Sequence, residues 1–225
     1  MTRPGIVRWL AGLAALIGLT LLVLAGATLG LDDATLGWFT ALDRPGVVHG
    51  IWRTLVMGGQ FWLVGTAAVV IALIRAVQWR SVRTFVVSAA AVASVDVLLL
   101  VSKPLVGRTS PHSGRNEVLV GGSSYPSGHT SNATMGLALI AVLLAGTSIY
   151  RRRALVVAAG CAAIVGICNL VLGYHWLSEV VAGWFLGTLV VTVAASLLPR
   201  KTLVPTVTDG GHQLQAPPGP RAGGS

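Results

Sequence analysis

Three polar residues that could together act on a phosphoryl group lie far apart in this chain: Lys103, His129 and His175. An imidazole can attack phosphorus or carry a proton near neutral pH, so two histidines can divide these two tasks. A lysine can hold its positive charge against phosphoryl oxygens. Such chemistry requires that elements distant in the sequence bring the three side chains to one place.

His129 ends the segment Tyr-Pro-Ser-Gly-His, which is followed by Thr-Ser-Asn and then by an apolar run. Ser, Thr and Asn before an apolar run are typical of a helix start. The free N–H groups and positive dipole of a helix start suit a phosphate, and Gly128 would let the backbone approach it closely. The amides around Ser127 and Gly128 are therefore candidate phosphate donors. The alternative is an ordinary junction between a loop and a helix.

His175 is followed four residues later by Glu179. If a helix begins here, the carboxylate lies one turn away and can bond one imidazole nitrogen. That bond would fix the tautomer and leave the other nitrogen free as a nucleophile. The alternative is an interfacial histidine in a turn.

Lys103 is followed directly by Pro104, which predicts that a helix ends near Lys103. Asp96 lies two turns earlier on the same helix face and is the nearest candidate partner of the lysine. An acidic residue inside an apolar span usually has a partner or a role. The alternative for Lys103 is a side chain that snorkels from a helix end into the interface.

The elements that must position these residues are long apolar runs. Of the 225 residues, 54% are hydrophobic and 10% are charged, and the mean hydropathy is +0.77, which is unusual for a soluble domain. Six runs approach the roughly 20 residues needed to span a bilayer. The sequence predicts an all-α, polytopic membrane protein with a six-helix domain over 1–200. The expected spans are 9–31, 55–74, 84–102, 132–150, 154–173 and 180–199.

The basic residues predict the orientation in the membrane. The net charge is +9, but these residues lie mostly in short clusters between apolar runs, so no nucleic acid partner is expected. With the N-terminus in the cytoplasm, the 16 Lys and Arg residues divide into 11 inner and 5 outer ones. This asymmetry predicts a plasma (inner) membrane protein with both termini in the cytoplasm. Lys103, His129 and His175 then share the extracytoplasmic face.

Two outer segments are long enough to fold. Residues 32–54 are expected to form an interfacial helix near Leu36 to Leu42, broken at Pro45-Gly46. Residues 103–131 are rich in Gly, Ser and Pro and are expected to form the loop that carries the site. Residues 201–225 are rich in Pro and Gly and lack a helical period, which predicts a disordered cytoplasmic tail.

Taken together, the three polar segments resemble the phosphatidic acid phosphatase type 2/haloperoxidase superfamily, in its membrane lipid phosphatase branch. The pattern of that family is Lys-x6-Arg-Pro, then Pro-Ser-Gly-His, then Ser-Arg-x5-His-x3-Asp. The middle motif is matched in full at 126–129, and Lys103, Pro111 and His175 also fit. The order of the motifs, the six-span plan and the outer placement agree over about residues 55–199.

The first and third motifs depart from the family pattern. Ser110 and Asn169 stand at the two arginine positions, and Glu179 stands at the aspartate position. Asn169 can donate a hydrogen bond but carries no charge. Arg108 lies two residues before the family arginine position and Arg115 follows in the same loop, so both are expected to supply the lost positive charge.

The resemblance implies a hydrolase of lipid phosphates or diphosphates that needs neither metal nor cofactor and forms a phosphohistidine. His175 would be the nucleophile, Glu179 would orient it, and His129 would protonate the leaving oxygen and then activate water. Polyprenyl diphosphate, phosphatidylglycerol phosphate and phosphatidate are the candidate substrates. The expected phosphate contacts are Lys103, Arg108, Arg115, Asn169 and the amides around Ser127 and Gly128.

Two alternatives stay open at this stage. A lipid phosphotransferase would form the same phosphoenzyme and resolve it with an alcohol instead of water. A non-catalytic member would bind lipid phosphates or a membrane partner; the absent arginines favour it, and the intact His129, His175 and Lys103 oppose it. The sequence leaves the oligomeric state undetermined.

Overall fold

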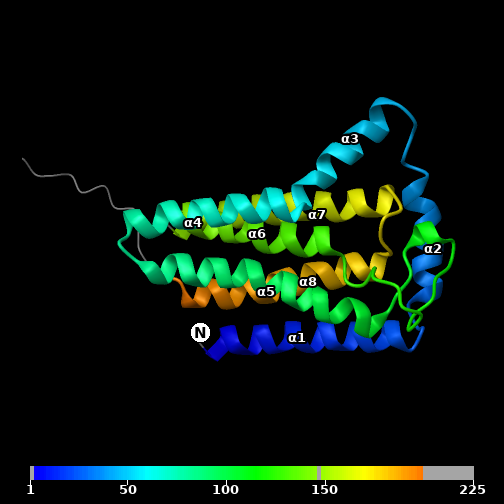
Figure 1. Ribbon diagram of the computed structural model, residues 1–225, viewed down its shortest axis with the longest axis horizontal. Helices are drawn as coiled ribbons and strands as arrows, with labels where there is room; N and C mark the ends of the chain where they lie inside the picture. The colour runs from blue at the N-terminus through cyan, green and yellow to red at the C-terminus, as the bar shows by residue number, and fades with distance from the viewer. Residues whose placement is uncertain (1–2, 146–147, 200–225) are drawn as a thin grey trace, which may run out of the picture.

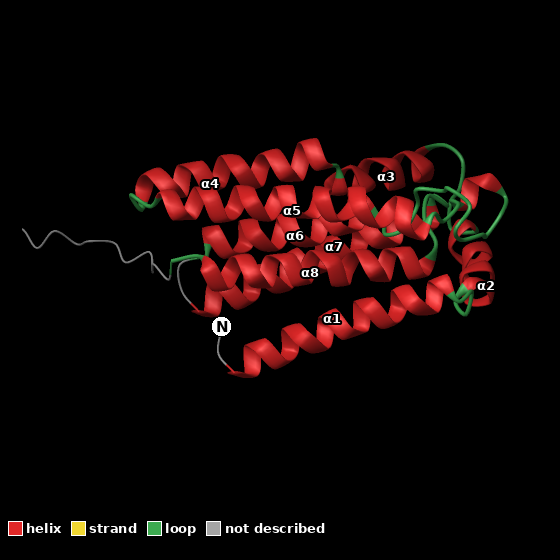
Figure 2. Ribbon diagram, turned by 60° about the horizontal axis from the view of Figure 1, so that its bottom comes forward, coloured by secondary structure: helices red, strands yellow, loops and turns green. Residues whose placement is uncertain are grey.

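A computed structural model describes residues 3–145 and 148–199 of the chain. Among these residues there is no β-strand, and the predicted all-α class is confirmed (Figures 1 and 2). The described residues form eight α-helices: α1 (Arg3–Leu24), α2 (Leu29–Thr40), α3 (Val47–Val56), α4 (Thr66–Gln78), α5 (Val82–Val106), α6 (Gly128–Leu144), α7 (Ser148–Val171) and α8 (Leu177–Leu197). A 3₁₀ turn (Met57–Gly59) and a π-helical turn (Phe61–Gly65) join α3 to α4.

Helix α6 lies inside the bundle and packs against α4, α5, α7 and α8. The core between these helices is aliphatic and includes Leu99, Met135 and Leu139. Small residues bring α8 close to α6: a Cβ atom added at Gly187 would lie 2.6 Å from the carbonyl oxygen of Ser131. Close backbone approach through glycine is a common way for helices to associate in membranes.

Within residues 3–145 and 148–199, five helical stretches are long and apolar enough to cross a membrane, and α6 is a shorter apolar helix of 17 residues. Seventeen residues rise about 25 Å, which is near the lower limit for a span. The second expected span, 55–74, is displaced to Phe61–Gln78. The reason is Gln60, whose extended backbone (φ −67°, ψ 128°) separates this span from α3.

Several helix ends differ from the predicted ones. Helix α6 covers Gly128–Leu144 rather than 132–150, and α7 begins at Ser148 rather than at 154. Helix α1 ends at Leu24 rather than at 31, because the chain turns at Gly26 (φ 74°) before α2 begins. The prediction that Pro104 ends α5 near Lys103 is wrong, because the helix continues through Pro104 to Val106. It ends at Gly107 (φ 56°), whose N–H donates to the carbonyl of Lys103, because glycine adopts this left-handed conformation without steric cost.

The outer segment 32–54 contains parts of two helices instead of one helix near Leu36 to Leu42. Helix α2 crosses the end of the bundle, whereas α3 runs obliquely away from it (Figure 1). The predicted break at Pro45-Gly46 is confirmed, since Gly46 has φ 87° and α3 begins at the next residue.

Helix α2, the 107–127 loop and the turn between α7 and α8 gather at one end of the bundle (Figure 1). The start of α1 and the connection between α4 and α5 lie at the opposite end. The three polar segments therefore share one end of the molecule, as the order of the spans predicts. The expected tail, 201–225, lies outside the described residues.

Candidate active site

His175 and Glu179 form a close pair at the start of α8. The Nδ1 atom of His175 lies 2.7 Å from Oε2 of Glu179. A carboxylate on Nδ1 keeps the proton on that nitrogen, so Nε2 carries the lone pair that a nucleophile needs. The imidazole also lines a cavity of about 420 Å³ at this end of the bundle.

The carboxylate of Glu179 is held in place by two further donors. Its Oε2 atom accepts hydrogen bonds from Oγ of Ser124 at 2.7 Å and from the backbone N–H of Trp176 at 3.1 Å. Glu179 is fully buried, so these bonds form where water does not compete. They fix the direction in which the carboxylate holds His175.

The Pro-Ser-Gly-His segment starts α6 as predicted. The Oγ atom of Ser127 accepts a hydrogen bond from the N–H of Thr130, which caps the helix. The N–H of Ser127 donates to the backbone carbonyl of Glu179 at 3.1 Å, so the starts of α6 and α8 are joined directly. His129 lies in the first turn of α6, within electrostatic range of both Lys103 and His175.

Lys103 lies in the last turn of α5, and its Nζ atom donates to the carbonyl oxygen of Ser123 at 2.6 Å. Its charge also interacts with the carboxylate of Glu179. The expected pair with Asp96 is not found among the described residues. Two turns separate these residues by about 10 Å along the helix, and the 107–127 loop offers a nearer acceptor.

Arg108 is not among the residues that line the cavity. The side chain is fully buried, with Nη1 2.6 Å from Oγ of Ser178 and Nη2 2.7 Å from Oδ2 of Asp32. Asn116 accepts a further bond from Nη2. Protein groups therefore occupy both terminal nitrogens of this guanidinium, which was expected to contact phosphate.

The remaining expected phosphate contacts are dispersed. Asn169 is fully buried, and its amide donates to the carbonyl of Val165 and, at 3.5 Å, to Oγ1 of Thr130. Arg115 is exposed on the loop, where its backbone carbonyl accepts bonds from two hydroxyl groups. Ser110, at the family arginine position, lines the cavity beside His175.

The whole bundle and this site can be compared with known proteins. The family model of the PAP2 superfamily matches residues 13–203, which is most of the chain. The chain belongs to the PAP2 superfamily. The resemblance inferred from the three motifs is thereby confirmed, together with the membrane-spanning helical fold.

A solved PAP2 structure has the same fold. It is described as the first transmembrane PAP2 type phosphatidylglycerolphosphate phosphatase, from Bacillus subtilis. The TM-score is 0.69 at 20% sequence identity, and the match covers 81% of this chain and 94% of that one. A search of curated proteins finds no significant match. This PAP2 protein is therefore an integral membrane protein.

Hydroxyl groups line much of the cavity in this PAP2 chain. Its walls combine backbone and side chains from the 107–127 loop with the turn before α8, and they include Thr109, Ser110, Ser113, Ser123, Ser124 and His175. Neither arginine of the loop is among the lining residues. At Ser110 the cavity therefore offers a neutral hydrogen-bond donor where the family pattern has an arginine.

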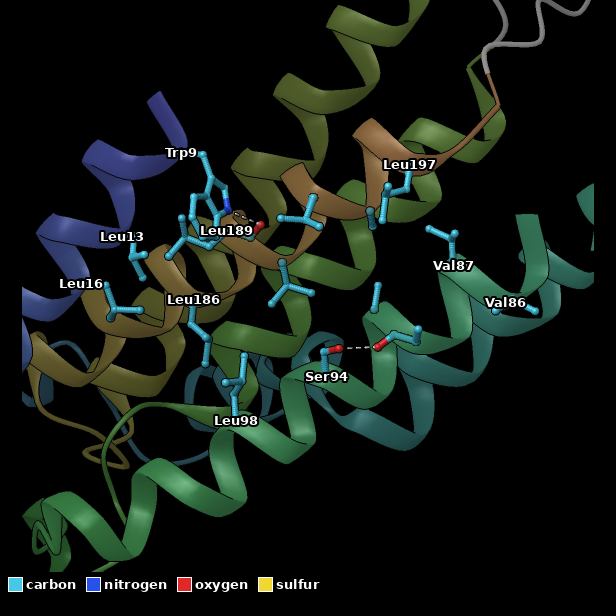
Figure 3. Close-up of a pocket in the computed structure, with 15 residues that line it drawn as sticks. Trp9, Leu13, Leu16, Val86, Val87, Ser94, Leu98, Leu186, Leu189 and Leu197 are labelled. Carbon is cyan, nitrogen blue, oxygen red and sulfur yellow. Dashed lines mark hydrogen bonds between the residues drawn. The ribbon is translucent and has the colours of Figure 1, made fainter. Parts of the chain in front are cut away.

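A larger cavity, of about 530 Å³, lies between α1, α5 and α8 (Figure 3). Its walls are almost entirely apolar and include Trp9, Leu13, Val87, Leu98, Leu189 and Leu197. It shares no lining residue with the cavity beside His175. Nearer that polar end, Tyr125 packs in a separate cluster with Val23, Val106 and Ala182. The Tyr125 hydroxyl lies 2.8 Å from Oγ1 of Thr20, and burial raises the pKa of this phenol, which stays protonated. The larger cavity is thus separate from the site.

Sequence reasoning missed three residues that hold the site together: Asp32, Ser124 and Ser178. Asp32 carried a signal, because an acidic residue directly after an apolar span usually has a partner. The two serines carried none, since serine is common in loops and at helix starts. Their contacts join segments far apart in the chain.

Proposed function

We propose that this protein is a lipid phosphate phosphohydrolase that works through a phosphohistidine. The observation that carries the proposal is the His175–Glu179 pair at 2.7 Å, with the imidazole on a polar cavity at one end of the bundle. Membership in the PAP2 superfamily supports the same activity.

The reaction has two steps. First, Nε2 of His175 forms a bond to phosphorus as the bond to the lipid oxygen breaks, and His129 donates a proton to that leaving oxygen. Second, a water molecule attacks the phosphohistidine while His129 takes a proton from it. The P–N bond then breaks, and inorganic phosphate leaves with both histidines restored.

Several groups stabilise the phosphoryl oxygens. Lys103 supplies a positive charge near Glu179 and His129. The N–H groups of Gly128 and His129 precede the first hydrogen bond inside α6, so they are free to donate to an anion. Arg115 on the exposed loop adds its charge to this set, whereas the buried Asn169 acts indirectly, by donating a hydrogen bond to Thr130 in the first turn of α6.

Substrate arrives from the outer leaflet, because the charge asymmetry favours an extracytoplasmic site. The hydroxyl-rich cavity favours a phosphate monoester over the more highly charged diphosphate. Phosphatidylglycerol phosphate and phosphatidate are therefore stronger candidate substrates than polyprenyl diphosphate. The solved structure of similar fold is described as a phosphatidylglycerolphosphate phosphatase, which supports this order.

Phosphate release tests the activity. Purified protein in EDTA is given each of the three lipids, and free phosphate is measured, with a lipid alcohol added in parallel. Release of phosphate supports the hydrolase, whereas transfer to the alcohol indicates a phosphotransferase. Binding of lipid phosphate without any release would favour a non-catalytic protein, as Ser110 and Asn169 at the arginine positions suggest.

The nucleophile is tested by His175→Ala. This variant should lose turnover and any acid-labile phosphoenzyme trapped with radiolabelled substrate, because no other group replaces Nε2. His49→Ala is the matched control, since His49 lies on α3 and pairs with Asp43 away from the cavity. Unchanged turnover in His175→Ala would refute the assignment.

A further inference from the structure

Asp32 is a buried carboxylate in the first turn of α2 that bonds to a different helix. Its Oδ1 atom accepts a hydrogen bond from the backbone N–H of Ser178 at 2.9 Å. Its Oδ2 atom accepts from Oγ of Ser178 at 2.8 Å and from Nη2 of Arg108 at 2.7 Å. Only 1% of the Asp32 surface is exposed, so every one of these bonds is shielded from water.

These contacts make Asp32 a cap for α8. Ser178 is the second residue of that helix, and its N–H has no acceptor within the helix. A carboxylate at this position satisfies the N–H and is favoured by the helix dipole. Because Glu179 is the next residue, α2 fixes the helix turn from which Glu179 reaches His175.

Arg108 connects the same carboxylate to Glu179. Its Nε atom lies 3.8 Å from Oε1 of Glu179. Neither atom has a hydrogen-bond partner among the described residues, and both are buried, so the contact between them is an ion pair. The guanidinium carbon of Arg108 lies 5.5 Å from the centre of the Trp176 ring, which covers it. This buried cation therefore has two buried carboxylates as neighbours, Asp32 and Glu179.

The direction of the guanidinium follows from Asp32. Its two terminal nitrogens point to Asp32, Ser178 and Asn116, which leaves only Nε toward Glu179. Oε2 of Glu179 stays with His175 and Ser124 as a result. An unanchored Arg108 would turn toward Glu179, because charge-assisted paired bonds between guanidinium and carboxylate are strong.

We propose that Asp32 and Arg108 form a positioning pair, which holds the carboxylate of Glu179 in the direction that His175 requires. The pair does not contact the cavity, and its effect on the reaction passes through Glu179. The inference rests on the proposed function, because the role of Glu179 in turnover does.

The test is Asp32→Asn, which keeps the shape of the side chain and removes its charge. We expect kcat to fall roughly 10- to 100-fold, the usual scale for a small misplacement of a reacting group, with KM changed less than about twofold. Asp43→Asn is the matched control, because Asp43 pairs with His49 and belongs neither to the cavity lining nor to the contacts of Arg108. It should leave kcat unchanged.

A second readout does not depend on turnover. In protein labelled with ¹⁵N-histidine, the Nδ1 signal of His175, assigned with His175→Gln, should move in Asp32→Asn and stay in Asp43→Asn. An unmoved signal together with normal kcat would overturn the positioning pair. If wild-type protein releases no phosphate but the signal moves, the pair stands and the proposed function fails.

A double variant separates positioning from general loss of structure. The effects of Asp32→Asn and Arg108→Gln on kcat should be far from multiplicative, because both act through one contact with Glu179. Multiplicative effects, or a fall in kcat that only follows a fall in Tm, would contradict the proposal.

Discussion

At the scale of single residues, Glu179 is shared between two sets of partners. Its Oε2 atom bonds to His175, Ser124 and the amide of Trp176, whereas Oε1 faces Arg108. Its reach from α8 allows one carboxylate to serve the histidine and the buried cation at once. The family pattern places an aspartate here, whose side chain is one methylene shorter.

Glu179→Gln should lower kcat by about 10²- to 10⁴-fold, the range usual for acid–base and orienting groups. The amide can donate to Nδ1 of His175, which would place the proton on Nε2 and remove the nucleophilic lone pair. Turnover with the best lipid substrate measures this effect. Glu117→Gln, at an exposed loop position, is the control. Equal rates in both variants would contradict the role of the carboxylate.

Arg108→Ala should lower the free energy of unfolding by about 3–5 kcal/mol, because it leaves Asp32 and Glu179 as buried charges without their cation. Denaturant unfolding in detergent measures the change. Arg115→Ala should stay within about 0.5 kcal/mol, since Arg115 is exposed. Similar stability of the two variants would mean that the guanidinium does not hold these carboxylates together.

At the scale of the elements, the starts of α6 and α8 form one unit. The N–H of Ser127 bonds to the carbonyl of Glu179, and glycines in α8 bring its backbone close to α6. A Cβ atom added at Gly183 would lie 2.9 Å from the carbonyl oxygen of Ser127. The distance between the Pro-Ser-Gly-His segment and His175 therefore depends on the packing of these two helices.

Gly187→Ala should destabilise the protein by about 1–3 kcal/mol, the usual cost of overpacking. The added Cβ would meet the Ser131 carbonyl oxygen at 2.6 Å, and a helix must shift to relieve this contact. Gly160→Ala in α7 is the matched control, since a Cβ there meets nothing within 4 Å. Thermal unfolding of both variants in detergent measures the difference. Equal Tm values would show that α8 does not depend on this close approach.

At the scale of the whole molecule, the two ends of the bundle differ in composition: one carries the polar cavity and the other carries a cluster of arginines. One end carries the cavity, α2 and the 107–127 loop, and the other carries the arginines that begin α7 and the connection from α4 to α5 (Figure 1). The proposed function requires that the first end faces outward.

Cysteine labelling in intact cells tests this orientation. In a Cys161→Ser background, which removes the exposed native cysteine, Ser123→Cys should react with a membrane-impermeant thiol reagent. Arg152→Cys should react only after the membrane is permeabilised, because the charge asymmetry places it inside. The reverse pattern would place the cavity in the cytoplasm.

The sequence by itself determined the helices and the local signals of the site. Apolar runs of sufficient length form helices in a membrane, since the backbone must satisfy its own hydrogen bonds there. The helix start at Gly128 and the contact of His175 with Glu179 four residues later are local too, so residue types and spacing predict them. The exact ends of the helices were less predictable. Pro104 and Gly107 are both residues that can end a helix, but α5 continues through Pro104 and ends at Gly107.

Only the tertiary structure decided where Arg108 points and what Asp32 does. These residues are 76 positions apart, and no periodicity links them. Loop position alone suggested that the guanidinium would reach the phosphate, whereas the fold surrounds it with Asp32, Ser178 and Glu179. A buried cation takes the partners that packing brings to it, because an unpaired charge away from water is costly. Which carboxylates those are depends on how α2 crosses the bundle end.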